Sequence, residues 1–315
     1  MKWAVRILGG VALATTAAGG GAYVLLPKDI AAESQFVVNR PLHSVVTWMA
    51  TTPDGDAFAE GVTETLRVRA SDHFESVLAL EKGKADVRYE LIPTAEGVQI
   101  KAAVKRDLGG DMLARANSAA AQAALQATLE AGVGALKQEL EALPTFDFAA
   151  LKYDIVDVQA RPFYFFEAQV STAQDDIVDA MRQSLPLLDA SFKVNNVEKA
   201  GPLIAVENNW VEGKSYSFSV GFPYKGEVRK QPLLFKTGET PAGKTIRVLY
   251  TGGEDQVIPV YDQVETLIKA ARLKRSGPSF EIYMDDVNQP GGSRNREIYH
   301  LIEGDVAALE KIPAQ

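Results

Sequence analysis

The sequence predicts an α+β protein with two folded domains behind an N-terminal apolar segment. In residues 34–143, strand-like runs lead into one long amphipathic helix, whereas residues 153–303 contain the order strand, helix, strand, strand twice. The 315 residues are enough to form a separate core in each domain. A net charge of −8 without a dense Lys/Arg face argues against a nucleic-acid partner, and the absence of cysteine excludes disulfides.

Residues 1–30 differ from the rest in character. Lys2 and Arg6 precede an uncharged run over residues 7–26, and a run of about 20 apolar residues is long enough to cross a bilayer. We interpret this segment as a transmembrane signal anchor; a cleaved signal peptide and a soluble tail are the alternatives. Because the positive charges precede the span, a single-pass protein would have its folded part outside the cytoplasm, in the periplasm.

The first predicted domain spans residues 34–143. A strand at 35–39 leads into a short helix with Leu42, Val45, Val46 and Met49 on one stripe. Strand-like runs separated by turns then follow at 66–70, 73–80, 87–92 and 98–104. A helical stretch over 111–143 closes the domain, with leucine and valine recurring at spacings of three and four.

This domain resembles the polyketide cyclase/START-like (SRPBCC) superfamily. The residues that carry the resemblance are Val37-Val38-Asn39-Arg40-Pro41, then Val45-Val46-Thr47-Trp48, and the stretch 132–141 in the last helix. The resemblance implies a curved antiparallel sheet that grips a long C-terminal helix around an apolar cavity. It implies a fold more than an activity, because members of one fold differ in function.

A linker is predicted at 144–152, and the second domain at 153–303, followed by a tail at 304–315. Its first unit has strand signals at 153–158 and 163–170, a helix from Thr172 that Pro186 should kink or end, and return strands at 203–206 and 216–222. A loop over 223–243 joins the units. The second unit has a strand at 244–250, a helix at 257–271, and strands at 280–284 and 296–302.

The second domain resembles the GyrI-like effector-binding module that is attached to many bacterial transcription activators. The matching residues are Tyr250 with Gly252-Gly253, the helix opened by Ile258-Pro259, and the segment Gly277-Pro278-Ser279-Phe280-Glu281-Ile282-Tyr283. The resemblance implies a small-molecule pocket with a glutamate and a tyrosine on its wall. No helix-turn-helix or basic region precedes the domain in this sequence, which disfavours a transcription regulator.

Glu281 is the leading candidate site residue. Strand parity places Glu281 and Tyr283 opposite Phe280 and Ile282, and we expect the latter face to pack on the helix. A solvated strand face is the alternative for Glu281. Trp210, Tyr216 and Phe218 are expected to ring the carboxylate, and the alternative for Tyr216 and Phe218 is a place in the helix-side core.

The sequence therefore predicts a membrane-anchored binding protein with an aromatic and acidic pocket for hydrophobic or cationic amphipathic ligands. The alternative is a hydrolase or isomerase in which Glu281 activates water with assistance from Tyr283, but general acid–base catalysis usually needs a second positioned group. The three histidines have no metal-ligand spacing, and no nucleophile elbow or phosphate loop is present. We predict no catalytic residue, metal or cofactor.

Overall fold

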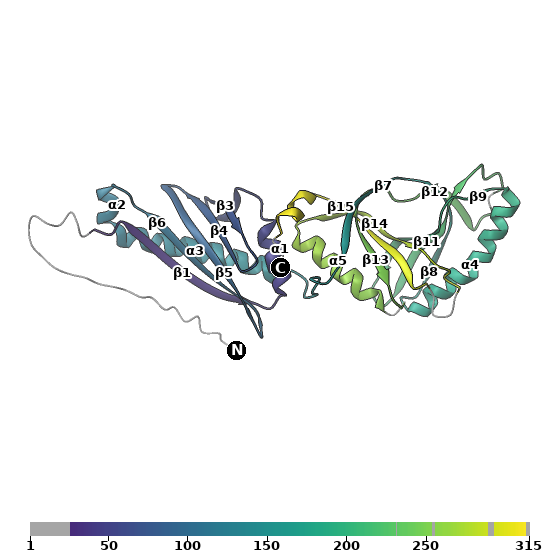
Figure 1. Cartoon of the computed structure of the whole chain (residues 1–315), viewed down its shortest axis with the longest axis horizontal. Helices are drawn as coiled ribbons and strands as arrows, with labels where there is room; N and C mark the ends of the chain where they lie inside the picture. Colours follow the sequence, from purple (N-terminus) through teal and green to yellow (C-terminus); the bar gives the residue numbers. More distant parts are fainter. Residues whose placement is uncertain (1–25, 231, 254–255, 289–292, 313–315) are drawn as a thin grey trace, which may run out of the picture.

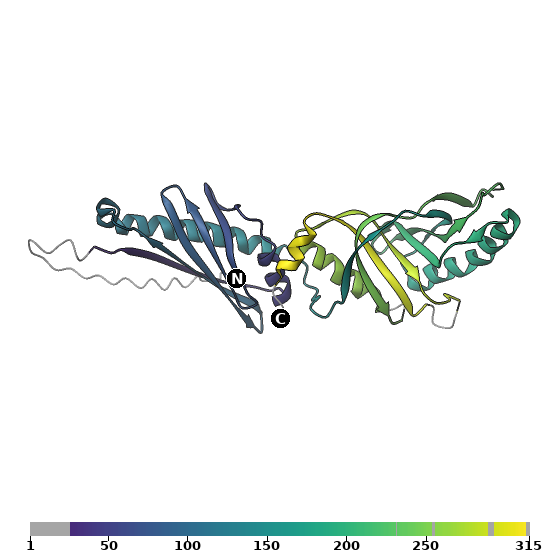
Figure 2. The same ribbon diagram turned by 45° about the horizontal axis from the view of Figure 1, so that its top comes forward.

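The computed structural model describes residues 26–230, 232–253, 256–288 and 293–312. Two α+β domains lie end to end along the long axis of the molecule (Figure 1, Figure 2), which confirms the predicted α+β class. No helix in these ranges is long and apolar enough to cross a bilayer. Residues 7–25 of the predicted anchor lie outside the described residues.

The first domain is a six-stranded antiparallel sheet with the strand order β1-β6-β5-β4-β3-β2. Its strands are β1 (Asp29–Val38), β2 (Asp56–Ala59), β3 (Val62–Arg69), β4 (His73–Leu80), β5 (Gly83–Thr94) and β6 (Gly97–Asp107). Its helices are α1 (Leu42–Ala50), α2 (Met112–Ala116) and α3 (Ser118–Glu141). The long closing helix α3 packs against this single sheet. Membership of the SRPBCC superfamily stays a prediction.

Strand β1 begins earlier than expected. Its pairing with β6 runs from Asp29 opposite Asp107 to Val38 opposite Val98, so residues predicted to end the anchor segment are sheet residues. Ile30 and Ala32 alternate with exposed neighbours and are buried in the core. A boundary at residue 30 was therefore wrong, because the polar Lys28-Asp29 pair marks the start of a strand.

Helix α3 packs on the sheet through an apolar stripe formed by Leu125, Leu129, Val133 and Leu140. Within that stripe, Gly132 lets the helix approach β2. A Cβ atom at this position would lie 2.3 Å from ring atoms of Phe58. The glycine therefore sets the distance between helix and sheet edge.

This close approach gives a first prediction. Gly132→Ala and Gly134→Ala lie one half-turn apart in α3, and a Cβ atom at Gly134 meets nothing within 4 Å. Both variants gain helix propensity, so the difference in their free energies of unfolding, about 1–3 kcal/mol, reports the clash alone. Urea denaturation should show Gly134→Ala to be the more stable variant. Equal stabilities would contradict the close packing of α3 on Phe58.

The second domain is a nine-stranded antiparallel sheet with the strand order β12-β8-β11-β10-β14-β15-β13-β7, to which β9 is added beside β11. The first half consists of β7 (Tyr153–Val158), β8 (Pro162–Val170), α4 (Gln174–Asn195), β9 (Glu198–Lys199), β10 (Leu203–Val211) and β11 (Ser215–Lys225). The second half consists of β12 (Phe235–Glu239), β13 (Gly243–Thr251), α5 (Ile258–Ala270), β14 (Lys274–Tyr283) and β15 (Asn295–Glu303), and the 3-10 helix η3 (Val306–Lys311) follows.

The two strand-helix-strand-strand units exchange their lead-in strands. β7 precedes the first unit but pairs with β13 of the second, and β12 precedes the second unit but pairs with β8 of the first. The units meet where β10 pairs with β14. The segment 223–243, expected as a loop, therefore contributes a strand, and 153–158 is an edge strand of the opposite half.

Both helices lie on one face of this sheet (Figure 1). α4 continues past Pro186 to Asn195, because Leu188 and Phe192 beyond the proline are buried against the sheet. An early end of this helix at Pro186 was therefore wrong. The opposite sheet face carries its own apolar cluster, made of Phe163, Ile204, Val206, Phe280, Ile282 and Tyr299. The expectation that Phe280 and Ile282 pack on the helix was also wrong, since they belong to the helix-free face.

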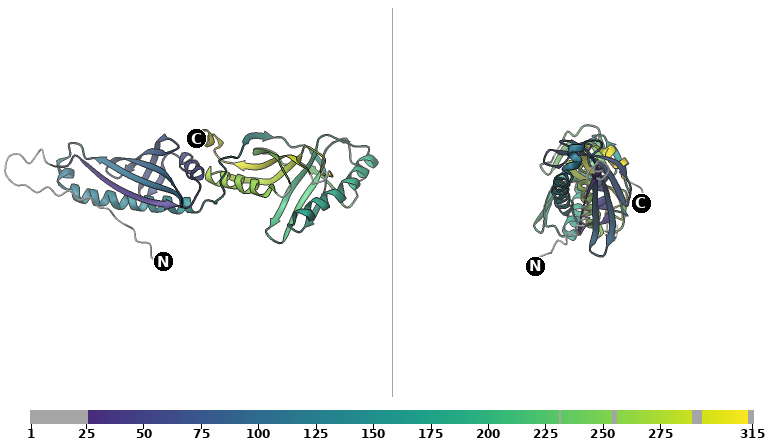
Figure 3. Two further views of the ribbon diagram at one scale, coloured as in Figure 1. Left: turned by 60° about the horizontal axis from the view of Figure 1, so that its bottom comes forward. Right: turned by 90° about the vertical axis from the view of Figure 1, so that its left-hand side faces the viewer.

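The two domains meet where α1 and α5 come together, at the centre of the molecule (Figure 3). Arg272 at the end of α5 has a φ of 57°, and its guanidinium lies 3.7 Å from the Trp48 ring centroid. It also pairs with Asp56 at 3.5 Å and Glu139 at 3.8 Å. In the segment predicted as a linker, Phe148 is only 1% exposed and joins the core of α5.

Candidate functional site

Glu281 lies on the helix-covered face of β14, between the core beneath α4 and the core beneath α5. Its neighbours in the sheet are Ala205 on β10 and Ile298 on β15, and it is 8% exposed. The Tyr261 hydroxyl of α5 donates a hydrogen bond of 2.7 Å to Oε1. Nη1 of Arg296 donates one of 2.9 Å to Oε2. Both oxygens of a buried carboxylate are therefore bound, which excludes the solvated strand face.

Arg296 is the cation of this cluster. It lies on β15 opposite Tyr283, and the residue is 3% exposed. Nη2 donates to the Ser293 carbonyl at 3.1 Å, and the guanidinium carbon lies 5.1 Å from the Tyr283 ring centroid and 5.7 Å from that of Tyr250. The buried site thus holds one negative and one positive charge, surrounded by aromatic faces.

The three aromatic residues predicted near Glu281 form a continuous row. The rings of Trp210 and Tyr216 are 5.3 Å apart, and those of Tyr216 and Phe218 are 4.9 Å apart and stacked. Phe218 is fully buried in the core of α4, whereas Trp210 is 41% exposed. The row therefore runs from the helix-side core, to which Phe218 belongs, to the surface at Trp210.

The tyrosines of the cluster are held neutral. Burial raises the pKa of Tyr216 above its usual range, with Glu281 and Glu207 adding to the effect. Burial likewise raises the pKa of Tyr261, and the charge of Glu281 and the neighbouring Tyr216 contribute further. Their hydroxyls remain hydrogen-bond donors at neutral pH.

A second polar group lies behind Tyr261. His300 is fully buried, its ring packs edge-on against Tyr261 at 5.2 Å, and Nδ1 lies 3.7 Å from Oε1 of Glu265. His300 and Arg275 lower the pKa of Glu265. Within the described ranges, no three His, Asp or Glu side chains lie close enough together to hold a metal ion.

Sequence reasoning missed Tyr261 and Arg296. A signal for Arg296 was present, because it shares strand parity with Ile298 and His300 on the face that bears Glu281. Tyr261 was interpreted as one member of an apolar helix stripe, and its hydroxyl gave no indication of a partner 20 positions later. The tyrosine that donates a hydrogen bond to Glu281 is therefore Tyr261, while Tyr283 contributes a ring beside Arg296.

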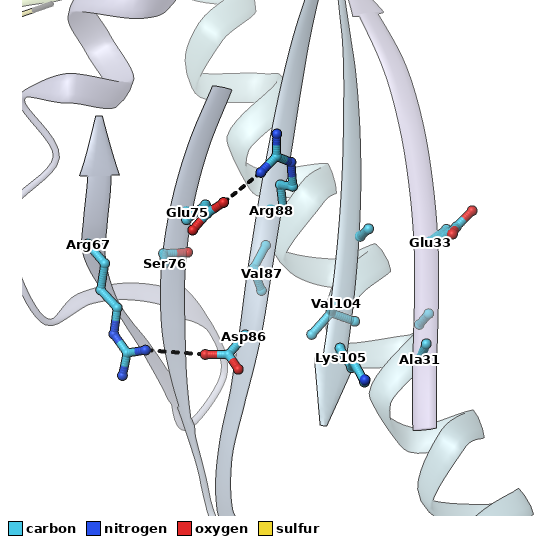
Figure 4. Close-up of a pocket in the computed structure, with 12 residues that line it drawn as sticks. Ala31, Glu33, Arg67, Glu75, Ser76, Asp86, Val87, Arg88, Val104 and Lys105 are labelled. Atoms are coloured by element: carbon cyan, nitrogen blue, oxygen red, sulfur yellow. Dashed lines mark hydrogen bonds and ion pairs between the residues drawn. The ribbon is translucent and has the colours of Figure 1, made fainter. Parts of the chain in front are cut away.

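The first domain has a charged hollow of about 510 Å³ on the exposed face of its sheet (Figure 4). Its charges are matched across strands: Arg67 pairs with Asp86 at 3.4 Å and Arg88 with Glu75 at 2.6 Å. Cross-strand ion pairs of this kind are an ordinary feature of an exposed sheet face. This hollow is therefore a weaker candidate than the Glu281 cluster.

A half-buried carboxylate also lies on the inner face of the first sheet. Glu64 accepts hydrogen bonds from Ser76 and from the Tyr89 hydroxyl, the latter at 3.0 Å. Burial raises the pKa of Glu64 above its usual value, and hydrogen bonds from Ser76 and Tyr89 oppose the shift. Both donors bind the same oxygen, Oε1, and they come from the next two strands of the sheet, β4 and β5.

An apolar hollow of about 490 Å³ lies at the far end of the second domain, between α4 and the segment before β12. Leu187, Val194 and Leu234 line it and are more than half exposed. The buried polar side chain in its lining, Ser191, is already hydrogen-bonded to the Tyr164 hydroxyl at 2.6 Å and carries no charge, unlike the Glu281 cluster.

The similar solved structures align with about half of this chain. No curated protein matches the sequence. Solved structures with a similar fold include the C-terminal domain of EcmrR, with 13% identity, a TM-score of 0.41, and coverage of 49% of this chain and 98% of that chain. SAV2435 bound to tetraphenylphosphonium has 13% identity, a TM-score of 0.38, and coverage of 49% and 95%. A hydrolase encoded by lin2189 from Listeria innocua has 10% identity, a TM-score of 0.36, and coverage of 50% and 95%.

One family model matches the chain, that of the GyrI-like small molecule binding domain, over residues 151–301. The match covers both strand-helix-strand-strand units and includes Tyr261, Glu281 and Arg296. Residues 151–301 of this chain form a GyrI-like small-molecule-binding domain.

Proposed function

We propose that the GyrI-like domain binds hydrophobic or amphipathic aromatic small molecules at the Glu281 cluster. We further propose that residues 7–26 anchor the protein in the membrane, with both folded domains outside the cytoplasm. The observation that carries the ligand proposal is the buried Glu281–Tyr261 hydrogen bond beside the Tyr216–Phe218 row, inside a domain whose family binds small molecules.

The chemistry of the cluster suits such ligands. Binding sites for small molecules combine apolar and aromatic walls with a few polar groups that fix orientation. Here Tyr216 and Phe218 offer ring faces, and the Glu281, Tyr261 and Arg296 group offers the polar contacts. Trp210 extends the aromatic row to the surface and marks the side from which a ligand would approach.

The hydrolase or isomerase alternative has less support. A general base must be within reach of the proton that it abstracts, and both Glu281 oxygens already accept hydrogen bonds from protein groups. Tyr283, expected to assist, lies beside Arg296. The cluster is better suited to holding a ligand than to activating water.

Calorimetric titration of the intact protein with triphenylphosphine oxide, an uncharged triaryl compound, tests the ligand proposal. Tyr216→Ala removes a ring face, so we expect binding to weaken by about 1–3 kcal/mol. Tyr224→Ala is the matched control, because it removes a tyrosine from the same strand, eight positions beyond Tyr216. Equal weakening by both variants, or by neither, would contradict a ligand site at Tyr216.

A further inference from the structure

We infer that Arg296 is a built-in cation that occupies the Glu281 carboxylate and makes the site select uncharged aromatic ligands over lipophilic cations. The inference rests on the proposed function, since it concerns the ligand class of the same site. It reverses the sequence-based expectation of cationic ligands, which assumed a carboxylate without a positive partner.

The guanidinium occupies the surroundings that a ligand cation would need. A carboxylate combined with aromatic ring faces is a favourable environment for a cation. Arg296 has that carboxylate at 2.9 Å and the faces of Tyr283 and Tyr250 at 5.1 and 5.7 Å. An entering cation would compete with an Arg side chain that is covalently present and therefore at high effective concentration.

The guanidinium is also difficult to displace. Its side chain is 2% exposed and that of Glu281 is 11% exposed, so separating them leaves charges in a medium that solvates them poorly. Arginine cannot lose its proton to escape this cost. The strand that carries it is fixed at its start, where Asp285 accepts hydrogen bonds from the backbone amides of Arg294 and Asn295.

Among the described residues, the carboxylates around the pair already have partners, since Asp285 is hydrogen-bonded as described above and Glu207 and Glu265 lie in ion pairs. Glu207 accepts a hydrogen bond from Ser279 and lies 3.8 Å from Arg275. Glu265 pairs with Arg275 at 3.3 Å. A neutral aromatic ligand can pack on the ring faces without disturbing these pairs, whereas an ion of either sign must break one.

Three probes differ in charge: tetraphenylphosphonium and tetraphenylborate have the same shape and opposite charges, and triphenylphosphine oxide is uncharged with one phenyl ring fewer. In calorimetric titrations of the intact protein, we expect the oxide to bind and each ion to bind at least about tenfold more weakly. Arg296→Met should raise the affinity for the phosphonium at least about tenfold. Glu281→Gln should do the same for the borate, because it leaves the guanidinium without its counterion.

Two further variants serve as controls. Arg247→Met removes the same charge from β13, where Arg247 lies on the opposite sheet face and pairs with Asp154 at 2.8 Å, so the affinities should not change. The double variant Glu281→Gln/Arg296→Met has no net charge at the site, so neither the gain in phosphonium affinity nor the gain in borate affinity should remain. Circular dichroism checks that each variant is folded. If Arg296→Met unfolds, the borate titration of Glu281→Gln tests the inference, and if Glu281→Gln unfolds, the phosphonium titration of Arg296→Met does so.

The outcomes separate this inference from the proposed function. Failure of the oxide to bind wild-type protein contradicts the proposed function itself. If wild-type protein binds the oxide, but Arg296→Met gains no affinity for the phosphonium and Glu281→Gln gains none for the borate, the inference is overturned and the proposed function stands. Tighter binding of the phosphonium than of the oxide by wild-type protein overturns it as well, whatever the variants do.

Discussion

Replacing Arg296 with methionine alone should lower the free energy of unfolding by about 3–5 kcal/mol, because it leaves Glu281 buried without its counterion. The double variant Glu281→Gln/Arg296→Met should recover most of this loss. It removes both charges together, and the glutamine oxygen still accepts the hydrogen bond from Tyr261. Urea denaturation of the two single variants and the double variant measures the coupling as a double-mutant cycle.

Arg247→Met provides the comparison for a less buried ion pair. The Arg247 side chain is 29% exposed and that of its partner Asp154 is 58% exposed, so the loss should be about 1 kcal/mol or less. If the losses from Glu281→Gln and Arg296→Met simply add in the double variant, the two groups do not interact, and the charge pair at the site is refuted.

Phe148→Ala should lower the free energy of unfolding by about 3–5 kcal/mol, which is the usual cost of deleting a fully buried phenylalanine. Phe148 packs into the core of α5, and its ring contacts His43 of α1 edge-on at 4.7 Å. It therefore connects both domains, although it falls in the segment 144–152 that the sequence suggests is a linker.

Phe146→Ala is the matched control for this second prediction. Phe146 is 46% exposed and two residues away, so its replacement should change stability by about 0.5 kcal/mol or less. Thermal and urea denaturation followed by circular dichroism compare the two variants. Similar small effects would show that the segment around Phe148 is a free connection between the domains.

The element order of both domains was predictable because each strand and helix has its own periodic pattern. The alternation in Gly97–Asp107 and the three-four spacing in Ile258–Ala270 each depend on local burial, which the sequence records directly. The placement of Glu281 and Phe280 on opposite faces of β14 follows from the same parity.

Other features depend on pairing between distant segments, which local patterns do not record. The exchange of β7 and β12 between the two units is a choice of edge partner, and either strand pattern fits either edge. Parity divides β14 into two faces but does not show which of them receives the helices, since both faces are buried. To predict the pairing of Arg296 with Glu281, one would need to know both which strands pair and which face of β14 the helices cover.

The most direct test of the central claim is a crystal structure of the protein with triphenylphosphine oxide bound. We expect the ligand to contact Tyr216 and Tyr261 beside Glu281, with the Glu281–Arg296 pair intact. A ligand bound instead in the apolar hollow of Leu187, Val194 and Leu234, away from Glu281, would contradict the assignment of this cluster as the binding site.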